Sequence, residues 1–164
     1  MKERSIELLN KAVADELSAV HQYMYFHFHC EDQGYDLLGD LFFKTAIEEM
    51  THIEAAAERV LYLGGEVEMV ASMEVQKIHE VKEMLKLARK MEEESIRDYN
   101  IWANETSANN DFGSRKVFEG LIEKEERHFD QFDIEIANLE KFGENYLALQ
   151  SIEGSKSRTA GGAE

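Results

Sequence analysis

No proline occurs among the 164 residues of this chain, and this absence constrains the fold more than any other feature. Proline ends helices because it lacks a backbone donor and its ring clashes with the turn before it. Glycine, the next strongest breaker, is largely confined to a few places and to the last residues. Long stretches without a breaker therefore predict long helices.

Four of these stretches carry apolar residues at steps of three and four, which is the spacing of one helix face. The expected helices span residues 5–30, 35–63, 75–106 and 112–141. Four helices of this length form a bundle, so the predicted fold class is all-α. The connections after the first and third helices are short and predict antiparallel neighbours, whereas the connection after the second is long enough to cross the bundle.

The C-terminal part of the chain is expected to add a short helix and a tail. Residues 145–152 follow Gly143 and predict a fifth helix. Residues 154–164 have almost nothing to bury and are expected to be disordered. We therefore expect one domain, residues 1–153, followed by that tail.

The chain carries 34 acidic and 18 basic residues, a formal net charge of −16. This balance argues against nucleic acid as a partner, because affinity for phosphate comes from lysine and arginine, and it favours metal cations. No uncharged run approaches the roughly 20 apolar residues that span a bilayer, and the first residues do not resemble a secretory leader. We therefore expect a soluble cytoplasmic protein without a membrane segment. Cys30 is the single cysteine, so any metal must be bound by oxygen and nitrogen.

Each expected helix has a carboxylate on its apolar face, near the middle of its length. These acids and the two histidines that follow them three residues later are Glu16, Glu49, His52, Glu92, Glu125 and His128. The phase of the apolar positions selects Glu92 over its neighbours Glu93 and Glu94. A buried unpaired carboxylate costs several kcal/mol, and no lysine or arginine stands on these faces, so two divalent metals are the expected counter-charge. One Glu from each of two helices and Glu-x-x-His from each of the other two is the ligand set of di-iron carboxylate bundles.

Three segments resemble the helix signatures of the bacterioferritins. They are Glu16-Leu-Ser-Ala-Val-His-Gln-Tyr23, Ala46-Ile-Glu-Glu-Met-Thr-His52 and Ile122-Glu-Lys-Glu-Glu-Arg-His128. The resemblance extends from about Lys11 to Gln150 and implies a ferritin-like four-helix bundle with a long crossover between its second and third helices.

The resemblance also implies the role of each residue in the centre. Glu16 and Glu92 would be terminal ligands, Glu49 and Glu125 would bridge two irons, His52 and His128 would each bind one iron, and Tyr23 would lie beside them. The implied function is iron storage and detoxification by a ferroxidase that oxidises Fe(II) with O2 or H2O2. Members of this family form hollow shells of 24 subunits built from two-fold dimers, which hold ferric mineral, and a reductase is a possible partner for its release.

A second set of residues concerns haem. Met50 aligns with the haem-ligating methionine of the family and lies about 100° around the helix from Glu49. The residues that share its flank, on the first two helices, are Leu17, Val20, His21, Met24, Phe43 and Ile47. Two such faces, related by a two-fold axis, could hold one b-type or other haem between two methionine sulfurs, or could pack as a dry dimer interface.

Other readings stay open at this stage. A haem-free ferritin or a peroxide-consuming, mini-ferritin-like di-iron protein would share the fold, and a helical scaffold would share the bundle without binding iron. Rubrerythrin needs four cysteines, and mini-ferritins usually place their irons between subunits. Bacterioferritins with an inner-surface iron site have a His and an Asp where Lys44 and Glu48 stand here, so that site is expected to be absent or altered.

Overall fold

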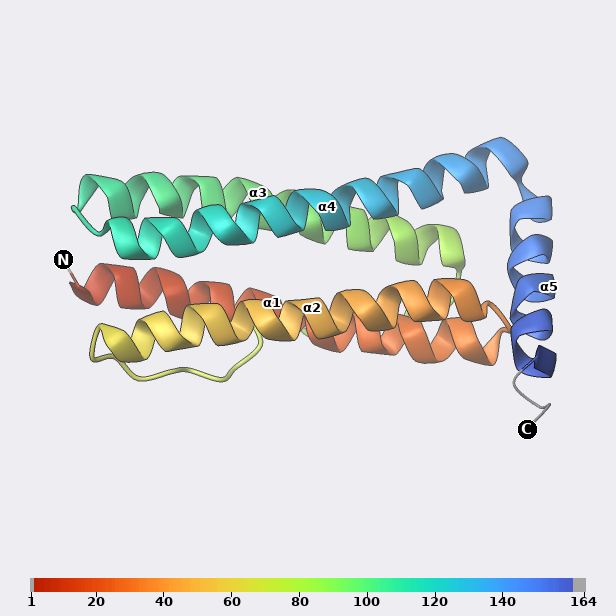
Figure 1. Ribbon diagram of the computed structural model, residues 1–164, viewed down its shortest axis with the longest axis horizontal. Coiled ribbons are helices and arrows are strands. Elements are labelled where there is room, and N and C mark those ends of the chain that lie inside the picture. The colour runs from red at the N-terminus through yellow and green to blue at the C-terminus, as the bar shows by residue number, and fades with distance from the viewer. Residues whose placement is uncertain (1, 161–164) are drawn as a thin grey trace.

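The structure is a computed structural model in which residues 2–160 are described. All of its regular elements in this range are helices, which confirms the predicted all-α class. They are α1 (Lys2–Asp32), α2 (Asp36–Tyr62), α3 (Val81–Ala108), α4 (Phe112–Phe142) and α5 (Glu144–Ala160). The first four lie side by side along the long axis, and α5 lies across one end of them (Figure 1). No helix in the described range is long and apolar enough to cross a membrane.

The connection between α2 and α3 runs along the outside of the bundle, as the sequence predicts, and it is extended (Figure 1). An extended segment without a partner strand must satisfy its backbone groups in another way. Polar side chains of α1 do this: Asn10 bonds the backbone of residues 66 and 68, Ser18 that of residues 72 and 73, and Gln22 that of Gln76.

These bonds also correct the predicted start of the third helix. We expected that helix to begin at Val75, but residues 75–80 are not helical and α3 begins at Val81. Gln22 donates to the carbonyl oxygen of Gln76 at 2.9 Å and accepts from its backbone nitrogen at 2.7 Å. Both backbone groups are therefore engaged by a side chain of α1 instead of a helical ladder.

The hydrophobic core is divided into two clusters along the bundle. One, toward α5, includes Tyr23, Phe42 and Phe132, whose ring centroids lie 5.5–6.1 Å apart. The other, at the opposite end, includes Leu9 and Phe118. The polar residues in the middle of the bundle therefore lie between two regions of apolar packing.

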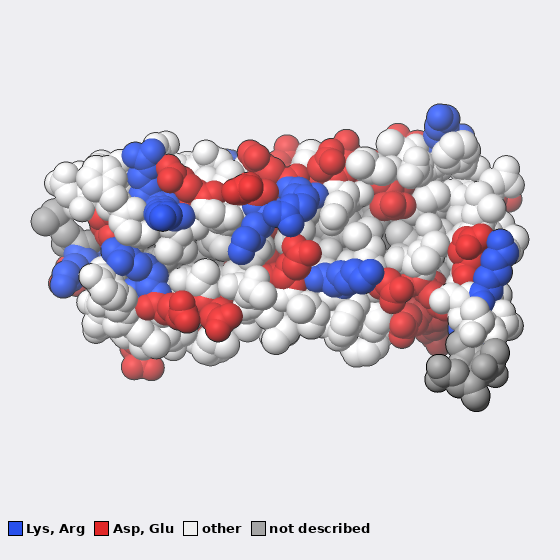
Figure 2. Space-filling model, in the orientation of Figure 1, with Lys and Arg blue, Asp and Glu red and all other residues white. Residues whose placement is uncertain are grey.

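Charged side chains are scattered over the face of the bundle that Figure 2 shows. On the face seen in Figure 2, acidic and basic residues are interspersed along the length of the bundle, and lysine and arginine do not gather into one patch.

The expectation of a disordered tail from residue 154 is wrong for residues 154–160, which continue α5. Gly154 is buried, and a Cβ at this position would lie 3.0 Å from Oδ2 of Asp36 at the start of α2. Arg158 forms an ion pair with the same carboxylate. The close contact at Gly154 and the ion pair of Arg158 therefore hold residues 154–160 against α2. The apolar pattern of the sequence does not indicate these contacts. Residues 161–164 lie outside the described range.

Replacement of Gly154 by leucine is expected to loosen α5, because the added side chain collides with Asp36. Hydrogen exchange of the α5 amides should become faster while that of α1 to α4 changes little. Gly120→Leu is the matched control, since Gly120 is a helical glycine with open space around its Cβ position. Equal exchange in both variants would show that α5 does not depend on this contact.

Candidate metal centre

The six residues predicted as ligands meet at the middle of the bundle. Each is at most 2% exposed, and they are Glu16, Glu49, His52, Glu92, Glu125 and His128. They come from all four long helices, because each helix places one glutamate on its inner face at about the same level. The pattern of acids on apolar faces therefore corresponds to a real cluster in space.

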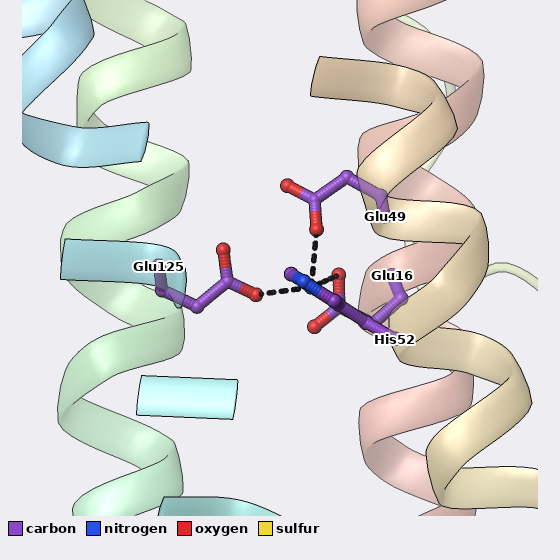
Figure 3. A group of neighbouring side chains, drawn as sticks. All are labelled: Glu16, Glu49, His52 and Glu125. Carbon is purple, nitrogen blue, oxygen red and sulfur yellow. Dashed lines mark hydrogen bonds and ion pairs between the residues drawn. The ribbon is translucent and has the colours of Figure 1, made fainter. Parts of the chain in front are cut away.

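The ligand atoms divide into two groups of four, and within each group they lie within 4.8 Å of one another. The first group is Glu16, Glu49, His52 and Glu125, and the second is Glu49, Glu92, Glu125 and His128. Figure 3 shows the first group, with Glu125 reaching from α4 toward the other three side chains. Because Glu49 and Glu125 belong to both groups, they are placed to bridge two ions, and Glu16 and Glu92 are placed to bind one ion each.

Both histidines turn Nδ1 toward the carboxylates. Nδ1 of His52 lies 2.7 Å from Oε2 of Glu49 and 3.1 Å from Oε1 of Glu125. Nδ1 of His128 lies 3.1 Å from Glu49 and 3.2 Å from Glu125. Oε2 of Glu49, although close to His52, has no hydrogen bond of good geometry. An oxygen and nitrogen donor set with such an unsatisfied buried oxygen fits a divalent cation such as iron.

Two tyrosines bond the unshared carboxylates. Tyr23 donates to Oε1 of Glu92, and Tyr99 donates to Oε1 of Glu16. Burial and the nearby carboxylates raise the pKa of both phenols well above 10, so each keeps its proton and remains a donor. From the sequence, Tyr23 is expected beside the centre and Tyr99 has no assigned role. The spacing could have indicated Tyr99, because each tyrosine follows the glutamate of its own helix by seven residues.

Without bound cations, the electrostatics of the centre favour the protonated forms of Glu49, Glu125 and His52. Burial, followed by the charges of Glu16 and Glu92, raises the pKa of Glu49 and Glu125 well above 4.5. Burial by itself would lower the pKa of His52, but hydrogen bonds with Glu16 and Glu49 outweigh it and raise that pKa to about 9. Burial by itself would raise the pKa of Glu16, but the hydrogen bond with His52 outweighs it and lowers that pKa to about 2, so this carboxylate stays charged.

A cavity of about 210 Å³ adjoins the centre between α1 and α3. Its walls include Asp15, Glu94 and Asp98, and its lining also includes Glu49 and Glu92. The cavity thus joins an acidic surface region to two of the buried carboxylates.

The residues of the predicted haem face lie on the outer flank of α1 and α2, away from the centre. Met50, Phe43 and Ile47 are 52%, 40% and 44% exposed. On α1, His21 is exposed, and three further side chains are half-buried, namely Leu17, Val20 and Met24. The sequence-predicted flank is therefore an exposed apolar face that carries a thioether.

Comparisons with known proteins agree with this geometry. Residues 6–142 match the ferritin-like domain family. The chain is 33% identical to the bacterioferritin of Desulfovibrio desulfuricans over 158 residues, which cover 96% of this chain and 87% of that protein. It is 29% identical to the bacterioferritin of Streptomyces coelicolor, over 95% of this chain and 93% of that protein.

Without metal, the chain is expected to lose stability as the pH rises from about 6.5 to about 9. The folded-state pKa of His52 is raised to about 9 from 6.5, so the folded chain binds more protons than the unfolded chain between these values. This stabilisation is complete below the lower value and is lost above the higher one, by an amount on the order of 3 kcal/mol. The raised pKa values of Glu49 and Glu125 act in the same direction.

Urea unfolding at a fixed protein concentration would measure this loss. The Zn2+-loaded chain is the control, since bound ions replace the protons and its stability should not fall over the same range. A metal-free chain whose stability stays constant across this pH range would contradict the conclusion that the folded centre binds extra protons.

Proposed function

The chain belongs to the ferritin family, with the bacterioferritins as its relatives, and from this premise we propose that it stores iron and oxidises Fe(II) at the buried centre. One observation carries the proposal: two groups of four ligand atoms share two carboxylates. Such sharing holds two ions close together, and a pair of Fe(II) ions can deliver two electrons to one oxidant.

The charge balance supports a ferroxidase. Two Fe(II) ions neutralise four carboxylates, and oxygen donors with imidazole also accommodate Fe(III). In the reaction, each of two Fe(II) ions loses one electron. These two electrons, with two protons, reduce O2 to H2O2 or reduce H2O2 to two molecules of water.

The residues of the chain have distinct tasks in this proposal. Glu49 and Glu125 hold both irons, and Glu16 and Glu92 each hold one. Tyr23 and Tyr99, by donating to the unshared carboxylates, fix which oxygen of each remains free to bind iron. The apolar clusters on both sides close the centre along the axis of the bundle.

Fe(II) is proposed to reach the centre through the cavity between α1 and α3. Its lining has more acidic than basic side chains, since Asp15, Glu94 and Asp98 stand against Arg97, which pairs with Asp98. This excess attracts a divalent cation, and Glu49 and Glu92 lie in the same lining. Product iron is then stored as ferric mineral inside a homo-oligomeric shell, which by likeness to the family would contain 24 subunits. A cytoplasmic location and a reductase that releases the iron stay predictions from the sequence.

We also propose a haem between two copies of the chain. The exposed apolar face around Met50 offers a thioether sulfur and apolar contact area, and a two-fold axis would supply a second sulfur. Haem bound there would supply one-electron transfer, while Met50 would ligate it and Phe43 and Ile47 would exclude water. The dry dimer interface remains the alternative use of this face.

The ferroxidase predicts a stoichiometry. Aerobic addition of Fe(II) to the metal-free protein should give a rapid phase of oxidation that saturates near two irons per chain, as in di-iron bundles. Glu49→Ala and Glu125→Ala should each abolish this phase, because the loss of a bridge uncouples the irons. Stopped-flow absorbance of the ferric product measures it.

The exposed Glu54 on the same helix provides the matched control. Glu54→Ala removes the same charge outside the centre and should leave the rapid phase unchanged. Wild-type rates in the Glu49 or the Glu125 variant would refute the assignment of these residues as bridging ligands. A protein that binds no stoichiometric iron would favour the helical scaffold without a metal centre.

Met50→Leu separates the haem from the ferroxidase. The exchange preserves volume and apolarity and should cost less than roughly 1.5 kcal/mol of stability. The low-spin haem absorption should disappear while rapid Fe(II) oxidation continues. Met24→Leu on α1 is the control and should retain the spectrum; the reverse outcome would make Met24 the ligand. A wild-type protein that takes up no haem when supplied with it would indicate a haem-free ferritin.

A further inference from the structure

The metal centre has an approximate internal two-fold symmetry. Exchange of α1 with α3 and of α2 with α4 maps one ligand group onto the other. The terminal glutamates exchange, the bridging glutamates exchange, the histidines exchange, and each tyrosine maps onto the other. Two ions held by this set would therefore be equivalent if the surroundings followed the same symmetry.

The surroundings of the histidines break this symmetry. Nε2 of His128 lies 2.7 Å from Oε2 of Glu48, which stands one residue before Glu49 on α2. At the equivalent position on α4, one residue before Glu125, the chain has Lys124. A lysine in its charged form has no acceptor to offer an imidazole N–H.

Nε2 of His52 is accordingly left without a partner. It is buried, and the structure gives it no hydrogen bond among the described residues. When Nδ1 of a neutral imidazole binds a metal, Nε2 must carry the proton and becomes a donor. For His128 this donor meets a carboxylate, whereas for His52 it is a buried unsatisfied group, which carries a desolvation penalty.

We infer that the two metal positions are inequivalent, and that the ion on the Glu92 and His128 side binds first and more tightly. Glu48 acts as a positioning residue: it fixes the ring of His128 and increases the basicity of its Nδ1. Outer partners of this kind typically change metal affinity by about 10–100-fold. The inference rests on the proposed two-metal centre and adds an order of filling to it.

The test is a titration of the metal-free, full-length protein with Co2+, followed by visible absorption. Two Co2+ per chain should bind in two steps whose dissociation constants differ by about 10–100-fold. His52→Ala should retain the tighter step and lose the weaker one, and His128→Ala should retain only the weaker step. The readout is binding and its spectrum, so it does not depend on iron oxidation.

Variants of the outer residues test the cause. Glu48→Ala should weaken the first step and bring the two constants together, and Glu48→Gln, which keeps an acceptor oxygen without its charge, should have a smaller effect. Glu54→Ala, which removes an exposed acid from the same helix, should change neither constant. Lys124→Glu should tighten the second step, because it offers His52 the acceptor that it lacks.

The possible failures are distinguishable. Two Co2+ that bind with equal constants, or constants that Glu48→Ala leaves as far apart as before, would overturn the inference and leave the two-metal centre intact. A wild-type chain that does not bind two Co2+ would overturn the proposed function and the inference together.

Discussion

Four carboxylates in the middle of one hydrophobic core are the constraint on which the rest of this structure depends. These carboxylates, on Glu16, Glu49, Glu92 and Glu125, are at most 2% exposed and lie between two apolar clusters, so their charges must be neutralised mainly from within the bundle. Protons do this in part, as the raised pKa values of Glu49 and Glu125 indicate. Divalent cations bound there would neutralise the same charge without leaving carboxylates protonated, which would couple metal binding to folding stability.

The centre uses only short spacings on straight helices. Residues three apart on a helix point in nearly the same direction, which brings a histidine beside the glutamate on α2 and on α4. Residues seven apart are stacked two turns away on one face, which brings Tyr23 from α1 to Glu92 and Tyr99 from α3 to Glu16. Two copies of each spacing, on paired helices, produce a symmetric site. Outside the ligand set the symmetry is broken, because α4 has Lys124 at the position where α2 has Glu48.

Adjacent residues of α2 serve two different surfaces. Glu49 is 1% exposed and faces the other helices, whereas Met50 is 52% exposed and faces outward. The rotation of about 100° per residue is enough to separate the buried carboxylate cluster from the exposed apolar face around Met50. A buried carboxylate and an exposed apolar side chain are therefore adjacent in the sequence. A substitution at one of these positions need not disturb the surroundings of the other.

The sequence by itself determined the helical class, the bundle, the long crossover and the six residues that meet at its centre. All of these follow from local rules: the absence of proline, the helical period of apolar residues, and the placement of an acid on each apolar face. The tertiary structure decided what depends on contacts between distant segments. Gln22 of α1 bonds the backbone before Val81, where α3 begins, and α5 continues to Ala160 in contact with Asp36 of α2. The partners of Glu16 and His128 also come from other helices. A helical period specifies which residues share a face, but only the packing of the helices specifies which side chain on a neighbouring helix each of them will meet.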